Sequence, residues 1–187
     1  MQEQIKNSLE TLKKGGIILY PTDTVWGIGC DATNEKAVEK IYNLKRRKES
    51  QSMLILLDNE NKLSRYVDVV PDIAYQLIEC SEEPITIIYP DARNMAKNLI
   101  NEDGSIGIRI VKNDFCKKLI GLLNKPIVST SANISGEKTP KRLNEISEMI
   151  ISGVDYIVDL PGFEEGTGKP SSIIKLEVNG EFKIIRK

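Results

Sequence analysis

The chain has 187 residues and a net charge of −1 at pH 7, with 40% hydrophobic and 28% charged residues. These values are ordinary for a soluble globular protein, and we expect residues 1–187 to form one domain. The near-neutral charge argues against a protein that holds nucleic acid by bulk charge, but it does not exclude binding through a local basic patch. The sequence contains no histidine, which excludes Ser-His-Asp and Cys-His catalysis and a His-ligated zinc site within this chain.

The N-terminal segment and the cysteines predict a cytoplasmic protein. Residues 1–16 lack the continuous apolar stretch of a secretory signal, and no apolar run reaches the length of a membrane span. Cys30, Cys80 and Cys116 are odd in number and widely spaced. This usage suits a reducing compartment, where we expect the thiols to pack as small hydrophobic groups.

Helical periodicity and strand-like apolar runs alternate along the chain. The predicted helices are residues 2–14, a helix capped by Asn34 that runs into the basic residues 45–48, residues 71–79, a helix capped by Asn113, and residues 143–151. The predicted strands are residues 17–20, 53–57, 85–89, 105–111, 127–128, 156–158, 172–176 and 182–185, with a turn at Asn179-Gly180 before the last. This alternation predicts the α/β fold class, with helices layered around a mixed sheet.

Polar loops follow three of the predicted strands, at residues 21–32, 129–140 and 159–170. Ligands of open α/β sheets bind where loops leave the carboxyl ends of strands, so we expect a site at that edge. The segment 129–140, STSANISGEKTP, is expected to be a strand-to-helix loop. Its composition is typical either of a plain turn or of an anion cradle made of hydroxyls, an amide and backbone N–H groups.

The basic run Lys45-Arg46-Arg47-Lys48 allows two interpretations. Basic residues at a helix end commonly face solvent and complement the helix dipole, but they also recognise phosphate groups. Lys45 and Arg47 are two residues apart and would not share one helical face, so they reach one ligand only if the helix ends there.

Two further loops also carry residues that suit a ligand site or a turn. The hydroxyls of Thr22 and Thr24 are typical of a turn, or of a pocket for a small polar substrate, and Trp26 is expected to pack rather than to stack on a base. The stretch FEEGTGK at 163–169 is not a phosphate-binding loop. Phe163 stands where the motif needs glycine, and Pro170 stands where it needs Ser or Thr.

Several motifs together resemble one known family, the YrdC-type proteins. They are GGIILYPTDTVWGIGCDA at 15–32, Lys45-Arg46-Arg47, IGIR ending at Arg109, STSANISG at 129–136 and PSSII at 170–174. The likeness extends from the first helix to Arg186 and is greatest to the single-domain threonylcarbamoyl-AMP synthases. It implies a twisted open mixed sheet with flanking helices and a concave, positively charged cavity.

The resemblance also implies an activity. L-threonine, bicarbonate or CO2, and ATP would give L-threonylcarbamoyladenylate and pyrophosphate, with Mg²⁺ carried on the phosphates and no metal site on the protein. A separate tRNA-modifying transferase complex would then move the threonylcarbamoyl group to an adenosine of tRNA. Because a carbamate oxygen attacks the α-phosphate, positioning and electrostatic stabilisation can supply most of the catalysis without a protein nucleophile.

Site residues follow from the resemblance position by position. The positions that match those holding L-threonine are Thr24, Arg109, Ser129 and Ser171. The positions that match those holding ATP are Arg47, Ser105, Ser131, Thr139 and Arg186. The set associated with activity is Lys45, Arg47, Ser131 and Asn133.

The sequence departs from the family pattern at a few positions. Lys48, Gln51 and Ser52 replace a proline and a Lys-Pro pair, and Leu56 stands where some members have histidine. The alternative is therefore a non-catalytic YrdC-like paralogue that binds RNA or nucleotide, which allows a weak RNA contact. A carbamoyl-transferring relative suits the length less well, because it normally occurs within a much larger chain.

Overall fold

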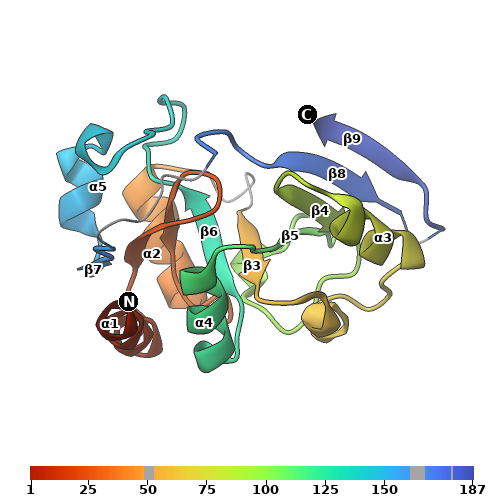
Figure 1. Cartoon of the computed structure of the whole chain (residues 1–187), viewed down its shortest axis with the longest axis horizontal. Helices are drawn as coiled ribbons and strands as arrows, with labels where there is room; N and C mark the ends of the chain where they lie inside the picture. Colours follow the sequence, from red (N-terminus) through yellow and green to blue (C-terminus); the bar gives the residue numbers. More distant parts are fainter. Residues whose placement is uncertain (49–52, 161–166, 178) are drawn as a thin grey trace.

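The structure is a computed structural model that describes residues 1–48, 53–160, 167–177 and 179–187. Within these ranges nine strands form a single sheet in the order β7-β1-β2-β6-β3-β5-β4-β8-β9 (Figure 1). The strands are β1 Ile18–Pro21, β2 Trp26–Gly29, β3 Leu54–Leu57, β4 Ile85–Tyr89, β5 Ile106–Ile110, β6 Ile127–Ser131, β7 Tyr156–Ile157, β8 Ser172–Leu176 and β9 Phe182–Arg186. The pairs β1/β7, β3/β5 and β4/β8 are parallel and the others are antiparallel, which confirms the mixed α/β sheet.

The helices are short and lie on both sides of this sheet. They are α1 Gln2–Lys13, α2 Glu35–Lys45, α3 Asp72–Cys80, α4 Asp114–Leu123 and α5 Glu148–Gly153, with short 3₁₀ helices η1 Glu60–Arg65, η2 Lys97–Leu99 and η3 Leu143–Glu145. As predicted, the side chains of Asn34 and Asn113 cap α2 and α4 by accepting hydrogen bonds from Ala37 N and Cys116 N. In the described part of the chain, no helix has the length and apolar character that crossing a membrane requires.

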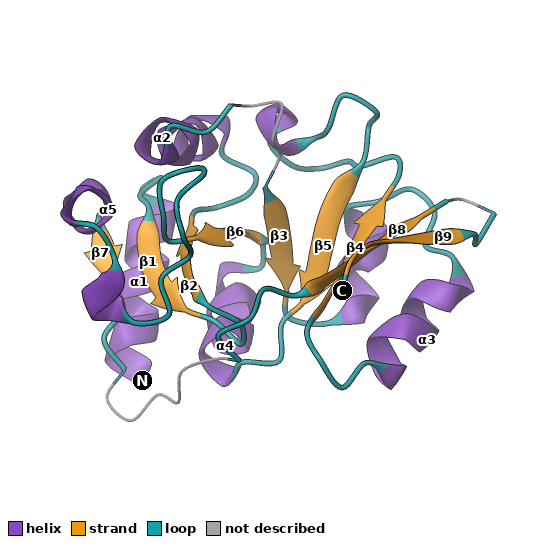
Figure 2. Cartoon of the chain, turned by 90° about the horizontal axis from the view of Figure 1, so that it is seen from above, coloured by secondary structure: helices purple, strands orange, loops and turns teal. Residues whose placement is uncertain are grey.

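Successive strand residues alternate between two hydrophobic cores. On β3, Ile55 and Leu57 belong to a first core that includes residues of α2, while Leu56 belongs to a second core that includes residues of α1 and α4. Figure 2 shows α2 on one side of the sheet and α1 and α4 on the other. Because side chains along a strand point to opposite faces in turn, each core lies against its own face of the sheet.

Three predicted segments differ from the structure. The segment 21–32 was expected to be a loop, but it contains β2, which pairs with both β1 and β6. Gly29 allows this close approach, since a Cβ there would lie 2.4 Å from the carbonyl oxygen of Val128. The strand β6 extends to Ser131, so the segment 129–140 begins within the sheet. The single helix expected at 143–151 is wrong, because η3 and α5 are separated by buried Ile146 and by Ser147 in an extended conformation.

The cysteine prediction is correct for two thiols of the three. Cys30 and Cys116 are buried and free, but Cys80, the last residue of α3, is exposed. Trp26 packs against the first core, as expected for a structural tryptophan.

Candidate active site

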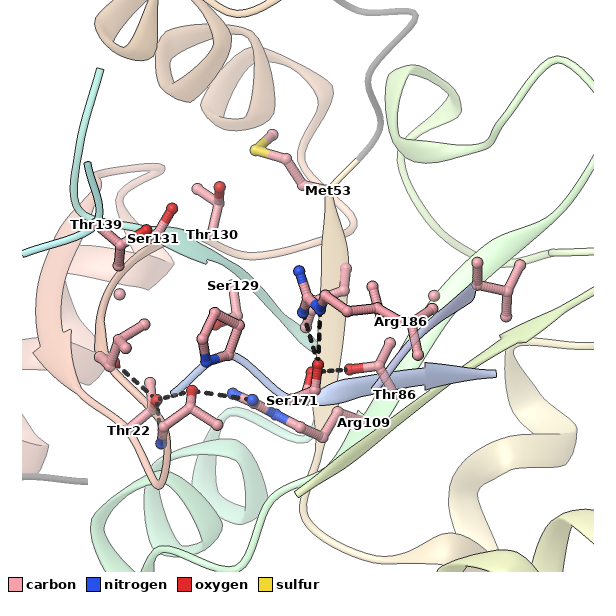
Figure 3. Close-up of a pocket in the computed structure, with 18 of the residues that line it drawn as sticks. Thr22, Met53, Thr86, Arg109, Ser129, Thr130, Ser131, Thr139, Ser171 and Arg186 are labelled. Carbon is pink, nitrogen blue, oxygen red and sulfur yellow. Dashed lines mark hydrogen bonds between the residues drawn. The ribbon is translucent and has the colours of Figure 1, made fainter. Parts of the chain in front are cut away.

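A cavity of about 280 Å³ lies over one face of the sheet (Figure 3). Alternate residues of two strands line it: Gly107 and Arg109 of β5, and Thr86 and Ile88 of β4. Leu54 of β3 also lines it, and Leu56, two residues further along that strand, lies in the second core. The cavity therefore lies on the same face of the sheet as α1 and α4. Residues of all three predicted loops line the cavity as well, for example Thr24, Thr139 and Pro170. What the sequence did not predict is the floor that β4 and β5 contribute from the sheet face.

Most of the predicted site residues meet in this cavity although they are far apart in sequence. Those that line it are Thr24, Arg47, Arg109, Ser129, Ser131, Thr139, Ser171 and Arg186. The three that do not line it are Lys45, Asn133 and Ser105. Figure 3 shows Thr139 and Ser131 at one end of the cavity, and Arg109, Ser171 and Arg186 grouped together.

The turn between β1 and β2 fixes Arg109. Its Nη1 donates to Thr24 Oγ1 at 3.0 Å, and its Nη2 lies 3.3 Å from Asp23 Oδ1. Asp23 is held in turn by the backbone N–H of Lys112, at 3.1 Å. Arg109 is only 3% exposed, and its Nε has no hydrogen-bond partner among the described residues. Because Arg109 lines the cavity, its guanidinium group is suited to an anionic group of a ligand.

Ser171, immediately before β8, is held from two sides. Its hydroxyl lies 2.7 Å from Thr86 Oγ1. Its carbonyl oxygen accepts two hydrogen bonds from Arg186 of β9, from Nε at 3.0 Å and from Nη2 at 2.7 Å. Sequence reasoning missed Thr86, because a threonine within a strand is typical of any sheet and carries no local signal of a site.

The helix α2 ends where the phosphate-binding interpretation required it to end. Arg46 takes a left-handed conformation, with φ 50°, directly after Lys45. The side chains of Lys45 and Arg47 then separate: Arg47 lines the cavity, while the amine of Lys45 donates to the carbonyl oxygens of Ser131 and Asn133. In this structure Lys45 therefore holds the segment after β6 from behind the cavity wall.

Burial changes the acid–base behaviour of Lys45. Its side chain is 1% exposed, and no carboxylate of the described residues forms an ion pair with it. Burial, together with the charge of Arg47, lowers the pKa of the Lys45 amine to about 7. A neutral amine still has two N–H groups, one for each carbonyl oxygen that it contacts.

The segment 129–140 combines the two interpretations that its composition allowed. Ser129, Ser131 and Thr139 line the cavity. Asn133 instead stabilises a turn, since its Nδ2 donates to the carbonyl oxygens of Ile134 and Glu137, both at 2.9 Å. The ligand-facing hydroxyls and the turn-forming amide are therefore neighbours in one segment.

Ser105 lines a second hollow that shares Ile88 and Asn101 with the main cavity. Its hydroxyl donates to Asp103 Oδ1 at 2.5 Å, and Asp103 also forms a 2.8 Å ion pair with Lys175. The hydrogen bonds from Lys175 and then from Ser105 lower the pKa of Asp103 to about 2. The Asp103 carboxylate is thus already neutralised by protein groups.

The charge of the main cavity is positive. Arg47, Arg109 and Arg186 line it, and none of the described lining residues is acidic. Burial lowers the pKa of both Arg47 and Arg186, and for Arg186 the neighbouring charge of Arg109 adds to this effect. Within the described ranges no group of three or more His, Cys, Asp or Glu residues could hold a metal ion. The cavity is therefore suited to an anionic ligand with polar hydroxyl-binding contacts.

Comparison with known proteins identifies the family. The family model Sua5_yciO_yrdC, described as "Telomere recombination", matches residues 10–187. The chain belongs to this family. A threonylcarbamoyl-AMP synthase of Pseudoalteromonas translucida is 33% identical over 96% of both chains, and one of Hahella chejuensis is 32% identical over 90% of this chain and 91% of that one.

A solved structure of the same family carries a ligand. It is the crystal structure of P. abyssi Sua5 complexed with L-threonine, which is 25% identical, covers 92% of this chain and has a TM-score of 0.84. The present chain spans 50% of the length of the P. abyssi protein. The family resemblance and the α/β fold expected from the motifs are both confirmed.

The departures from the family pattern fall into two groups. Leu56 is fully buried in the second core, and Lys48 is exposed after α2. Gln51 and Ser52 lie outside the described residues, as do residues 161–166 of the loop 159–170. The end of that loop is described: the backbone N–H of Gly168 donates to the carbonyl oxygen of Thr24 at 2.9 Å, and Pro170 lines the cavity.

Proposed function

We propose that this protein is an L-threonylcarbamoyladenylate synthase, an enzyme that uses L-threonine, bicarbonate or CO2, and ATP. The observation that carries the proposal is the single cavity in which hydroxyls and three arginines from distant segments meet. Relatives about one-third identical over nearly the whole chain are named threonylcarbamoyl-AMP synthase, which supports the same activity. The threonine complex of P. abyssi Sua5 supports the amino-acid substrate.

The reaction has two steps, formation of a carbamate and its transfer to the adenylyl group of ATP. The amine nitrogen of L-threonine bonds to the carbon of CO2 and loses a proton, which gives a carbamate. A carbamate oxygen then forms a bond to the α-phosphorus of ATP, while the bond from that phosphorus to the bridging oxygen breaks and pyrophosphate leaves with the electron pair. Negative charge moves onto pyrophosphate, so fixed guanidinium groups stabilise the transition state without a protein nucleophile.

We assign residues to this reaction as follows. Thr24, Arg109, Ser129 and Ser171 would hold L-threonine, and Arg47, Ser131, Thr139 and Arg186 would hold the nucleotide. Lys45 and Asn133 would support the end of β6, where Ser131 lies, and the segment that follows it, and Ser105 would act from the adjoining hollow. Mg²⁺ would arrive on the triphosphate and need few protein ligands.

The proposal extends to the surroundings of the reaction. We place it in the cytoplasm, where ATP and tRNA are found, and we propose that a separate threonylcarbamoyl transferase complex consumes the product for tRNA modification. Weak RNA contact near the arginines is part of this proposal. We also propose that residues 1–187 form one YrdC-like domain, since the strands of the described ranges join in one sheet.

The test is pyrophosphate release from ATP. We expect release that requires both L-threonine and bicarbonate, and we expect it to fall at least 100-fold in Arg47→Ala, because two or more charge-assisted contacts of about 1.5–3 kcal/mol each are lost. Arg65→Ala is the matched control, since Arg65 in η1 is exposed and does not line the cavity. Absence of threonine-dependent release, together with tRNA binding that falls steeply with salt, would instead support a non-catalytic RNA-binding paralogue.

A further inference from the structure

Two threonines to which the family resemblance gives no role contact the proposed L-threonine site. Thr22 and Thr86 both line the cavity, and they are 2% exposed each. Each places its hydroxyl against the hydroxyl of a proposed substrate contact, Thr24 or Ser171. A hydroxyl has one proton to donate and two lone pairs, so the direction of each of these bonds decides what is left for a ligand.

The direction of the Thr22–Thr24 bond follows from counting donors and acceptors. Thr22 Oγ1 donates its proton to the carbonyl oxygen of Val25 at 2.8 Å, and it accepts from the backbone N–H of Thr24 at 3.1 Å. Its proton is thus used, so in the 2.9 Å contact between the two hydroxyls Thr24 must be the donor. Thr24 also accepts from Arg109 at 3.0 Å. One lone pair of Thr24 therefore remains for a ligand, and its proton does not.

Thr86 and Ser171 form a second pair of buried hydroxyls. Among the described residues, Ser171 Oγ is the hydrogen-bond partner of Thr86 Oγ1, at 2.7 Å. Both residues are buried, at 2% and 3% exposed, so this one bond serves both hydroxyls. The bond fixes the position of the Ser171 hydroxyl in the cavity wall.

The backbone around Ser171 leaves its hydroxyl as the part still free to rotate. Arg186 holds the carbonyl oxygen of Ser171, and the backbone N–H of Ser172 donates to the carbonyl oxygen of Pro84 at 3.1 Å. Thr86 is itself buried within β4, at 2% exposed. A fixed threonine hydroxyl thus sets the rotation of a serine hydroxyl on a fixed backbone.

We propose that Thr22 and Thr86 are positioning residues for the hydroxyls of Thr24 and Ser171. This inference rests on the proposed function. Thr24 then offers an acceptor, suited to the ammonium or hydroxyl group of L-threonine. Ser171 offers a hydroxyl of fixed position near the guanidinium group of Arg109, and the two are suited to its carboxylate (Figure 3).

The test is L-threonine binding by calorimetric titration, combined with pyrophosphate-release kinetics. Thr86→Val removes the hydroxyl and keeps the branched shape, and we expect it to weaken L-threonine binding about tenfold, the loss typical of one hydrogen bond. The KM for ATP should stay within about twofold of wild type. Thr86→Ser restores the hydroxyl and should restore binding. If Thr86→Val does not fold, Thr86→Ala takes its place with the same expectation.

A double-mutant cycle separates positioning from a direct contact. If Thr86 acts through Ser171, Thr86→Val should weaken binding no further in a Ser171→Ala background. Thr22→Val should likewise add little in a Thr24→Val background, with Thr22→Ser as its restoring control. Additive losses in these cycles, or wild-type affinity in Thr86→Val, would overturn the inference while leaving the proposed function intact. Failure of the wild-type protein to bind L-threonine, with and without ATP, would overturn both.

Discussion

The buried amine of Lys45 gives a quantitative prediction about stability. Lys45→Met removes the titrating group but keeps a side chain of similar length and shape. The pKa of the amine is about 7 in the folded protein, against 10.5 for an unperturbed lysine. The unfolded chain therefore binds more protons than the folded chain between pH 7 and 10.5, so the contribution of Lys45 makes stability rise with pH across this window.

The expected magnitude follows from the same two values. One group that is protonated only in the unfolded state changes the free energy of unfolding by about 1.4 kcal/mol per pH unit. From pH 7 to 9.5 the wild-type protein should gain about 3 kcal/mol relative to Lys45→Met, and below pH 7 the two profiles should run parallel. Burial also raises the pKa values of Tyr20, Cys30 and Cys116, but these groups are present in both proteins and their contributions cancel in the comparison.

The assay is urea unfolding of both proteins at half-unit steps from pH 6 to 9.5. Lys40→Met is the matched control, because Lys40 is an exposed lysine of the same helix. Its profile should follow that of the wild type at every pH. Parallel profiles for wild type and Lys45→Met above pH 7 would show that the Lys45 amine keeps its charge in the fold, and the reasoning from burial would be wrong.

Two other predictions test the walls of the cavity. Arg109→Met should lower the free energy of unfolding by about 3–5 kcal/mol, because it leaves the charge of Asp23 largely buried without its partner. In urea unfolding, adding Asp23→Asn should recover much of that loss. No recovery would contradict the ion-pair account. Gly107→Val should fill the floor, where a Cβ would lie 3.3–3.4 Å from Thr86 and Leu54, and should weaken L-threonine binding in calorimetry by about tenfold or more; unchanged binding would place the ligand elsewhere.

The parts of the fold that local chemistry determines were predictable from the sequence. Asn34 and Asn113 identified the starts of α2 and α4, because an amide oxygen at that position satisfies a backbone N–H of the first turn. The strand β2 was missed because Gly27 and Gly29 read as loop residues. Gly29 is required there, because a Cβ would lie 2.7 Å from the Tyr20 side chain, and this contact exists only once β1 and β2 have paired.

The candidate site was predictable in its residue types more than in its geometry. The motifs identified the lining hydroxyls and arginines. They could not show that Lys45 lies behind the cavity wall, because the carbonyl oxygen that it contacts belongs to Ser131, 86 residues away in sequence. No local pattern encodes such a contact. The position on the sheet face was also missed, since it depends on which part of that face α4 leaves uncovered.

The alternation along the central strands has a consequence for how this protein can diversify. On β5 the cavity positions Gly107 and Arg109 are interleaved with the core positions Ile106 and Ile108. Residues that face the cavity and residues of the first core thus alternate along the same strand. A library confined to the uncharged cavity positions of β4 and β5 could alter the preferred amino acid while leaving the opposite layer untouched.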